Sequence, residues 1–352
     1  MDREKVWQFI ERVTGFAAGF TTIGLLALGD RSGILAVLAA EGPLTVTDLA
    51  GRAEVDERYS REILSGLAVA GILDYDAADE TFTLPEEHAA VVADDASPYS
   101  FTGYLDMLPA MAGQLPALAE AVRRGGGVPF EGFGEGAVSG IDRANSPGMR
   151  ILLTKRWLPA AMPDVVETLE AGGRVADIGC GSGMAAVAMA TAYPDSAVVG
   201  LDVDRRSIDR AEARRAEAGL VNLTFRVGDA ASLAPEPGFD LVTAFDVVHD
   251  LADPLGTLRR VRRALRPGGV LLMMEPKVTA DLQGDIGNER AALVYGMSTM
   301  FCLTQSLAVG GAGLGAAWGP NRAEALCREA GFSGFETLAI DNPFSAFYRV
   351  TP

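Results

Sequence analysis

The fold of this 352-residue chain is decided by the stretch VADIGCGSG, residues 175–183. A short β-rich run ends here in three glycines at alternate positions, and a helical run, Met184–Ala192, follows directly. Glycine lets a backbone pass close to a ligand because it carries no Cβ. The order strand, glycine turn and helix therefore predicts a ligand-binding turn at the carboxyl end of a strand.

From Gly172 onward, β-rich and helical runs alternate along the chain. The expected strands are Arg174–Ile178, Ala197–Leu201, Leu223–Val227, Asp240–Phe245 and Val270–Met274, and the expected helices are Met184–Ala192, Arg205–Ala218 and Pro254–Leu265. Strands that alternate with helices indicate βαβ units and a parallel sheet covered on both faces. We expect an α/β, doubly wound, Rossmann-like domain over residues 161–352.

The first part of the chain has a different pattern, which is typical of a winged helix. The segment 34–40 is an apolar helix stopped by Gly42-Pro43, Thr47 is expected to cap a short helix over 48–53, and Asp56 begins a third helix. Residues 72–75 and 81–84 can then pair as a hairpin. We expect a mostly helical winged-helix and dimerisation domain over 1–97 and a helical linker over 98–160.

Charge and cysteine content limit the partners of the chain. Its net charge is −17, and residues 41–84 hold ten acidic residues against three arginines. Because duplex binding depends on basic side chains, we expect no nucleic-acid partner.

Three scattered cysteines and the absence of a signal peptide favour the cytoplasm. The uncharged segment Val13–Gly29 is slightly short for a membrane span. We therefore expect no membrane partner, and a homodimer formed through this glycine-rich helix.

Acidic residues follow the expected strands, at the edge where a ligand would lie. Asp202 ends the second strand and suits ribose hydroxyls, and Asp229 follows the third and suits the exocyclic amine of adenine. Residues 181–186 also fit the dinucleotide pattern GxGxxG/A, so this loop alone leaves a nicotinamide oxidoreductase open. Asp177, just before the glycines, would disfavour a pyrophosphate and attract a cation. This acidic rim suits S-adenosylmethionine (SAM), which carries an ammonium and a sulfonium.

Five motifs in order and spacing resemble class I SAM-dependent methyltransferases: residues 175–183, 200–202, 228–230, 239–242 and 265–269. Residues 28–84 resemble the N-terminal winged-helix domain of bacterial small-molecule methyltransferases. Residues 306–319, 330–332 and 342–344 resemble an actinobacterial branch of that group. The resemblance implies a seven-stranded sheet whose last two strands, Phe335–Ile340 and Ala346–Val350, form an antiparallel hairpin.

The resemblance also implies roles for the residues of these motifs. Asp177, Gly179 and Gly181 would surround the methionine part of SAM, Asp202 would hold the ribose, and Asp229 and Ala230 would bind the adenine. Cys180, Gly183, Val203 and Asp246 complete the predicted cofactor-binding set. The alternatives are that Asp229 is a turn residue and that Asp177 is a helix N-cap.

His249 is the acid–base candidate, since it follows the fourth strand on the ligand side of the sheet. Imidazole titrates near neutral pH, and the similar His-Asp pair of winged-helix O-methyltransferases implies that His249 is a general base. Those enzymes usually have tryptophan where this chain has Leu251. The alternative is that His249 only caps a helix or orders its loop. Asp250 is not expected to orient His249, because adjacent side chains point apart.

Glu275 ends the fifth strand and is the candidate for positioning substrate or imidazole; it could equally be a solvated strand end. His88 is expected to be inert. With one histidine near the site, we predict no metal. Five apolar residues are expected either to line a substrate pocket or to be plain core: Tyr295, Met297, Met300, Phe301 and Trp318.

These features predict methyl transfer from SAM to a small aromatic or secondary-metabolite acceptor, at oxygen. Two further alternatives stay open. One is a carbon-, nitrogen- or sulfur-directed methyltransferase in which His249 is not catalytic. The other is a SAM-sensing DNA-binding regulator.

Overall fold

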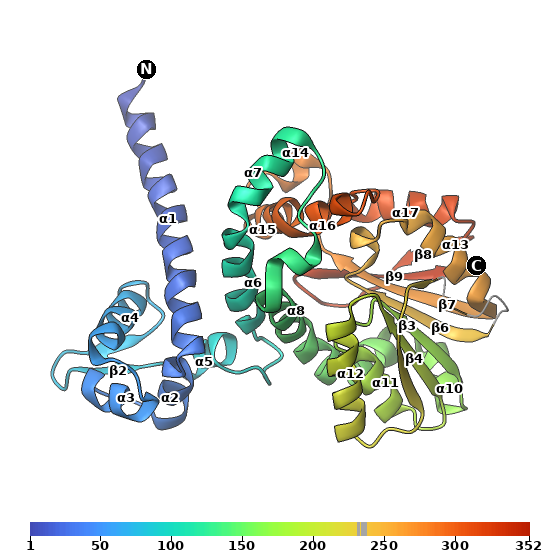
Figure 1. Cartoon of the computed structure of the whole chain (residues 1–352), viewed down its shortest axis with the longest axis horizontal. Coiled ribbons are helices and arrows are strands. Elements are labelled where there is room, and N and C mark those ends of the chain that lie inside the picture. Colours follow the sequence, from blue (N-terminus) through green and yellow to red (C-terminus); the bar gives the residue numbers. More distant parts are fainter. Residues whose placement is uncertain (231–232, 234–237) are drawn as a thin grey trace. The chain divides into compact units, whose positions relative to one another are not determined.

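The computed structural model describes residues 1–230, 233 and 238–352. The chain divides into two compact units (Figure 1). The first comprises residues 1–112 and 135–147, and the second comprises residues 113–134 and 148–352. The segment 98–160, expected as a linker, contributes helices to both units.

The first unit has the expected winged-helix arrangement. Its elements are α1 (Arg3–Arg31), α2 (Ile34–Glu41), α3 (Val46–Ala53), α4 (Glu57–Val69), β1 (Asp74–Asp76), β2 (Thr81–Thr83), α5 (Glu86–Val92), α6 (Thr102–Gly113) and α8 (Gly134–Gly148). Its core is formed by apolar side chains of α1 to α4 and the hairpin, with Leu35, Leu49 and Leu64 fully buried. Burial of these helix faces provides most of the stability of such short helices.

Two local predictions for this unit were wrong in detail. The cap of α3 is Thr45, not Thr47: the Thr45 hydroxyl accepts the Asp48 N–H at 3.2 Å. A start at Val46 buries both Val46 and Leu49, which selects the earlier threonine. The hairpin begins at Asp74 and not at residue 72, because the two preceding N–H groups bond back to the Leu67 carbonyl at the end of α4.

An ionic network joins three helices of the first unit. Arg143 on α8 donates to Asp30 of α1 at 2.8 Å and to Asp106 of α6 at 2.9 Å. It also donates to Asp95, in the loop between α5 and α6, at 2.9 Å. Arg31 adds a second bond to Asp106, at 3.1 Å. The three carboxylates raise the pKa of Arg143, so this guanidinium is a permanently charged tie between α8 and the N-terminal helices.

Helix α1 is longer than the expected segment and carries a large exposed apolar surface. It runs for 29 residues and is capped by Asp2, whose carboxylate accepts two N–H groups of the first turn. By length and composition alone, α1 and the stretch Glu289–Ala308 could each cross a membrane. Within the structure, 33% of the apolar window in the second stretch is buried, against 17% in α1.

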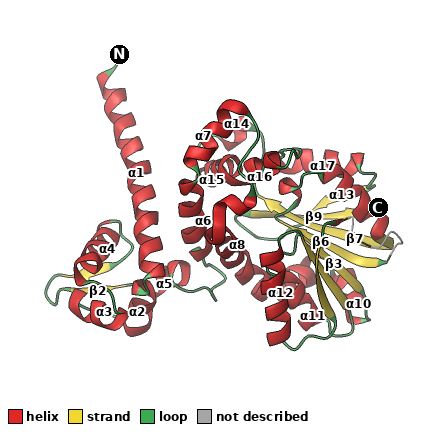
Figure 2. Ribbon diagram, in the orientation of Figure 1, coloured by secondary structure: helices red, strands yellow, loops and turns green. Residues whose placement is uncertain are grey.

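The second unit is built on a sheet with helices packed around it (Figure 2). Its seven strands have the order β5-β4-β3-β6-β7-β9-β8. The strands are β3 (Arg174–Ile178), β4 (Ala197–Asp202), β5 (Leu223–Val227), β6 (Phe239–Phe245), β7 (Leu265–Pro276), β8 (Gly334–Thr337) and β9 (Ser345–Thr351). Strands β3 to β7 are parallel, and β9 and β8 are antiparallel. The expected fold class and the final antiparallel hairpin are confirmed.

Helices cover both faces of this sheet, as the alternating pattern predicts. One face packs against α10 (Pro163–Glu170), α11 (Met184–Ala192), α12 (Arg205–Glu217) and the π-helical segment Met149–Trp157. The other packs against α13 (Pro254–Ala264) and α17 (Gly319–Glu329). The remaining helices are α7 (Leu115–Arg124), the 3₁₀ turns Phe130–Phe133 and Val248–Asp250, α9 (Leu158–Ala161), α14 (Leu282–Asp285), α15 (Glu289–Met297), the π-helical segment Ser298–Cys302 and α16 (Leu303–Ala308).

Strand order reverses between β3 and β6, which are neighbours although β4 and β5 lie between them in sequence. In such sheets the ligand crevice opens at the carboxyl ends of the strands on either side of this switch point. The glycine turn follows β3, and the His249 turn follows β6. The topology thus places the two sequence-predicted motifs side by side.

Candidate functional site

The turn after β3 adopts a conformation that requires glycine. Gly179, Gly181 and Gly183 have φ angles of 63°, 54° and 81°. A Cβ on Gly179 would lie 2.2 Å from the Val247 side chain, and one on Gly183 would lie 2.4 Å from Phe225. A Cβ on Gly181 would meet nothing within 4 Å. The outer two glycines are therefore needed for packing, whereas Gly181 leaves its space open for a ligand.

Asp202 ties the glycine turn to the end of β4. Its carboxylate accepts the Gly181 N–H at 2.8 Å through one oxygen and the Asp204 N–H at 2.8 Å through the other. Burial raises the pKa of Asp202, although these hydrogen bonds oppose the rise. Val203, the next residue, is 73% exposed. Asp202 thus fixes the backbone of the turn and keeps lone pairs for hydroxyl donors, while Val203 offers an apolar surface beside it.

Asp177 is buried beneath the glycine turn. Thr243 of β6 donates to its Oδ1 at 2.6 Å, and its Oδ2 has no hydrogen-bond partner among the described residues. Burial raises the pKa of Asp177 to about 7; the Thr243 hydrogen bond opposes this, and the charge of Asp202 adds to it. Asp177 is not a helix N-cap, because α11 begins after Gly183. Asp177 is therefore a buried carboxyl group with one oxygen that accepts no hydrogen bond from the described residues.

The remaining predicted cofactor residues lie around this turn. Asp229 is exposed just after β5, and Ala230 is buried in the same apolar cluster as Ile178 and Leu201. Cys180 is half-buried, and burial raises its pKa well above the ordinary value. Asp246 follows β6 with φ 50°, its N–H donates to the Met274 carbonyl at 2.9 Å, and burial raises its pKa to about 7. The position of Asp229 after a strand fits both interpretations, an adenine-binding residue and a turn residue.

His249 is buried and held by a carboxylate from the next strand. Its Nδ1 lies 2.5 Å from Oε2 of Glu275, at the end of β7. Glu275 is only 1% exposed, and it also accepts the Val248 N–H at 3.1 Å and the Trp318 indole N–H at 3.0 Å. Glu275 is therefore no solvated strand end. It fixes the ring of His249 and leaves Nε2 for other chemistry.

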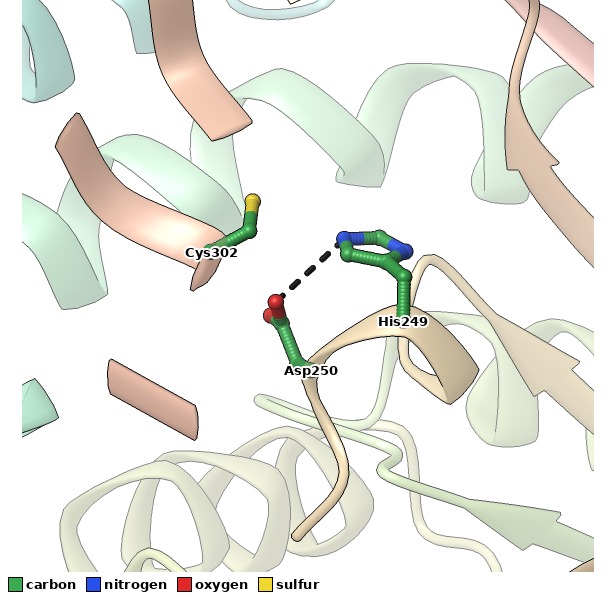
Figure 3. Close-up of side chains that lie close together, drawn as sticks. All are labelled: His249, Asp250 and Cys302. Atoms are coloured by element: carbon green, nitrogen blue, oxygen red, sulfur yellow. Dashed lines mark ion pairs between the residues drawn. The ribbon is translucent and has the colours of Figure 1, made fainter. Parts of the chain in front are cut away.

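Asp250 lies against the same imidazole, contrary to the prediction that adjacent side chains point apart. Its Oδ1 is 3.4 Å from Nε2 of His249 (Figure 3). The reason is the 3₁₀ turn Val248–Asp250, which curls the two side chains toward each other, whereas successive residues of a strand point to opposite faces. Gln305 donates to the other carboxylate oxygen of Asp250 at 3.0 Å and fixes its orientation.

These carboxylates set the charge of His249. Burial by itself lowers the pKa of the imidazole, but the charges of Asp250 and Glu275 outweigh it, and the pKa rises well above 6.5. The opposite charges favour the imidazolium form. His249 therefore holds a proton readily, and it can act as a base only from its neutral form.

The glycine-rich segment 306–319 supports the His249 turn from one side. The Ser306 hydroxyl donates to the Leu251 carbonyl at 3.2 Å, the Gly315 N–H donates to the His249 carbonyl at 3.3 Å, and Trp318 holds Glu275. Trp318 is thus a buried support of the site and not a pocket wall. Sequence reasoning missed this role, because only the fold brings Trp318 to a carboxylate 43 residues earlier.

The other candidate pocket residues are divided between core and partly buried positions. Phe301 is buried, with its ring 4.8 Å from that of Phe133 and 6.1 Å from that of Phe130. Tyr295, Met297 and Met300 are partly buried. His88 is exposed in the first unit, and its Nδ1 lies 2.9 Å from the Ile72 carbonyl. Cys302, which the sequence did not single out, is buried beside His249 and Asp250.

Comparison with known sequence families now adds to this geometry. Residues 169–326 match the family described as "Methyltransferase domain", and residues 21–94 match the "Rv2258c-like winged HTH domain". The matched residues 169–326 carry a methyltransferase domain, and a winged HTH domain precedes it. The resemblance to the class I fold with an N-terminal winged helix is confirmed.

Two curated relatives each match about a third of the chain. The 27-O-demethylrifamycin SV methyltransferase of Amycolatopsis mediterranei is 38% identical over 107 residues, which cover 30% of this chain and 39% of the relative. The trans-aconitate 2-methyltransferase of Methylobacterium nodulans is 38% identical over 122 residues, covering 35% and 45%. The match thus spans less than half the length of these relatives.

Solved structures match the methyltransferase domain and the winged helix together. A Nostoc punctiforme protein assigned as an O-methyltransferase aligns with a TM-score of 0.73 at 17% identity, and the alignment covers 100% of this chain and 99% of that protein. Mitomycin 7-O-methyltransferase aligns with a TM-score of 0.72 at 21% identity, covering 100% of both chains. Human N-acetylserotonin methyltransferase in complex with SAM aligns with a TM-score of 0.68 at 21% identity, covering 98% and 97%. These likenesses show a common fold.

Proposed function

We propose that this protein transfers a methyl group from SAM to a hydroxyl oxygen of a small aromatic or secondary-metabolite acceptor. The observation that carries the proposal is the buried His249, whose Nδ1 is fixed by Glu275 beside the glycine turn. The matched proteins support oxygen as the acceptor atom. Their names specify a rifamycin and a mitomycin O-methyltransferase, and one further structure holds a hydroxynaphthoic acid with SAM.

The residues of the turn fit SAM in shape and charge. Gly181 leaves open space, Asp202 has lone pairs for the ribose hydroxyls, and the spare oxygen of Asp177 suits a cationic group. Asp229 and Ala230 would hold the adenine, and Val203, Gly179 and Gly183 complete the cradle. When bound, SAM supplies an electrophilic methyl group on a sulfonium. Buried carboxylates stabilise such a cation better than they would a pyrophosphate.

His249 would accept the acceptor proton at Nε2. Glu275 holds the opposite ring nitrogen, so the ring cannot rotate away from the acceptor. Asp250 and Glu275 together stabilise the imidazolium that forms. General-base catalysis of this kind contributes about 10²–10⁴-fold to a rate.

Mass spectrometry of reactions with SAM and a panel of hydroxylated aromatic acids tests this function. We expect a product that is heavier by one methyl group, together with S-adenosylhomocysteine. The matched control is the same acceptor with its hydroxyl already methylated, which should give no product. Methylation of the blocked acceptor would place the methyl group on the carboxylate oxygen or on a ring carbon, and would contradict transfer to the hydroxyl.

Replacing Gly181 by alanine tests the cofactor cradle. We expect a modest stability loss of about 1–2 kcal/mol, because alanine is strained at φ 54°. We also expect SAM affinity, measured by calorimetry, to fall at least about tenfold, because the new methyl group enters the open space. Gly219→Ala is the matched control: it has φ 64° and equally open space on the loop after α12. Equal SAM affinity in the two variants would contradict the proposed cradle.

We further propose a cytoplasmic homodimer formed through α1, with no nucleic-acid or membrane partner. Phe9, Val13, Phe16 and Phe20 are each at least 46% exposed and are spaced by four, three and four residues. This spacing is that of a coiled-coil seam. A second copy of α1 would cover it.

The dimer predicts a clear effect of charge on this seam. Phe16→Glu should convert a dimer into a monomer in multi-angle light scattering, because a carboxylate would be buried without a partner. Tyr59→Glu, at an exposed position on α4, is the control and should leave the dimer intact. A monomeric wild-type chain, or binding of the wild type to lipid vesicles through α1, would contradict this assembly.

A further inference from the structure

The cluster His249, Asp250 and Cys302 joins three different ligand types at one point (Figure 3). The imidazole and the carboxylate come from the turn after β6, and the thiol comes from the π-helical segment Ser298–Cys302. One donor atom from each residue lies within 4.8 Å of the other two. His249 and Cys302 are buried, with exposed fractions of 3% and 6%.

We propose that these three side chains form a site for a thiophilic divalent cation of the Zn²⁺ class. Nitrogen, sulfur and oxygen donors of this kind are those that Zn²⁺ takes in proteins. A site with three protein ligands leaves a fourth position open, so its ion can exchange. The inference concerns metal binding and holds whether or not the protein transfers methyl groups.

The donor geometry supports this assignment. Bond lengths of about 2.0–2.3 Å place neighbouring donors of a tetrahedral zinc ion roughly 3.3–3.7 Å apart. His249 Nε2 and Asp250 Oδ1 already lie 3.4 Å apart. The Cys302 sulfur lies within 4.8 Å of the other two donor atoms, so it has to move toward them by about 1 Å to reach the spacing of zinc ligands. A change at its single χ1 angle can supply such a movement.

The surroundings of the cluster also fit a cation. Asp250 Oδ1 is buried and accepts no hydrogen bond from the described residues, and its 3.4 Å ion pair with His249 Nε2 is the contact that a cation would replace. Gln305 already satisfies the other oxygen. Glu275 holds His249 through Nδ1, which is the usual carboxylate–histidine–metal arrangement that orients a ligating ring. Trp318 in turn fixes Glu275.

Occupation of this site would displace the proton on Nε2 and take the lone pair that a general base needs. This consequence depends on the proposed function: zinc would inhibit methyl transfer, and a chelator would restore it. The metal site itself is measured without any acceptor, so failure of the methyl-transfer proposal would leave that measurement unaffected.

Titration of the purified full-length protein with Co²⁺ tests the site directly. We expect one Co²⁺ per chain with a thiolate-to-cobalt charge-transfer band in the near ultraviolet, and displacement of that ion by Zn²⁺. Cys302→Ala should abolish the band and weaken zinc binding at least about 100-fold, since even outer partners of a ligand cost 10–100-fold. Cys327→Ala is the matched control, since it removes another buried thiol, on α17. This variant should keep both the charge-transfer band and the zinc affinity of the wild type.

Asp250→Asn provides a second variant in case Cys302→Ala does not fold. It should keep the charge-transfer band but weaken binding by at least about tenfold. Three results would each overturn the proposal. They are a charge-transfer band that persists in Cys302→Ala, an unchanged zinc affinity in Asp250→Asn, and the absence of cobalt binding at millimolar concentration.

Discussion

Replacing His249 by alanine is expected to lower kcat for methyl transfer by about 10²–10⁴-fold, the range for loss of a general base. The acceptor hydroxyl would then lose the imidazole that takes its proton. Steady-state kinetics with a responsive hydroxylated acceptor, in the presence of a chelator, gives the measurement. SAM affinity should change little, because neither the glycine turn nor Asp202 bonds to the His249 side chain.

Two further variants separate catalysis from folding. His88→Ala removes the other histidine of the chain, which is exposed in the first unit, and should leave kcat unchanged. Glu275→Gln should also lower kcat, because the amide cannot accept all three donors that reach the carboxylate. A His249→Ala enzyme that keeps a tenth or more of the wild-type kcat would show that methyl transfer proceeds without this base.

Much of the fold could be predicted from the sequence, because its signals are local. The alternation of β-rich and helical runs placed β3 to β7 within a few residues, except that β7 begins at Leu265 and not at residue 270. The antiparallel β8–β9 hairpin came only from family resemblance, since two short strands carry no mark of their direction. Thr45 was missed because burial of Val46 and Leu49, and not cap preference, selects the helix start.

The candidate site was less predictable, because its contacts join distant segments. His249 could be found because it follows β6, and Glu275 because it lies at the end of β7. The contacts of Trp318 with Glu275 and of Thr243 with Asp177 depend on how strands and loops align in space. The position of Asp250 was predicted wrongly because the argument assumed extended backbone, whereas the chain forms a 3₁₀ turn there.

Asp177→Asn is expected to make the ligand-free protein more stable at pH 8 and no more stable at pH 4. The folded-state pKa of Asp177 is about 7, well above the ordinary value near 3.9, so the folded protein binds the proton more tightly. Because the folded protein binds this proton more tightly than the unfolded chain, protonated Asp177 contributes its full stabilisation below pH 4. This contribution is lost as the pH rises through 7. A difference of about 3 in pKa corresponds to about 4 kcal/mol. The unpaired amide N–H of asparagine costs about 1–3 kcal/mol of that gain.

Urea unfolding of the wild type and the variant from pH 4 to 8 measures this difference. Asp246 also has a raised pKa, but it is present in both proteins and cancels in the comparison. Thr243 can still donate to the asparagine oxygen, so the packing beneath the glycine turn is kept. Parallel stability curves over the whole range would mean that Asp177 is ionised at low cost in the folded protein.

SAM binding should reverse the effect of this buried carboxyl group. A cation placed near Asp177 favours its charged form and lowers its pKa, so the wild type should release a proton when SAM binds near pH 7. Calorimetry in two buffers of different ionisation enthalpy detects that proton, and Asp177→Asn should lose the release and bind SAM more weakly. The charged Asp177 would then lower the free energy of unfolding of the ligand-free protein, and bound SAM would remove this destabilisation. Proton release that persists in the variant would place the cation beside a different carboxylate.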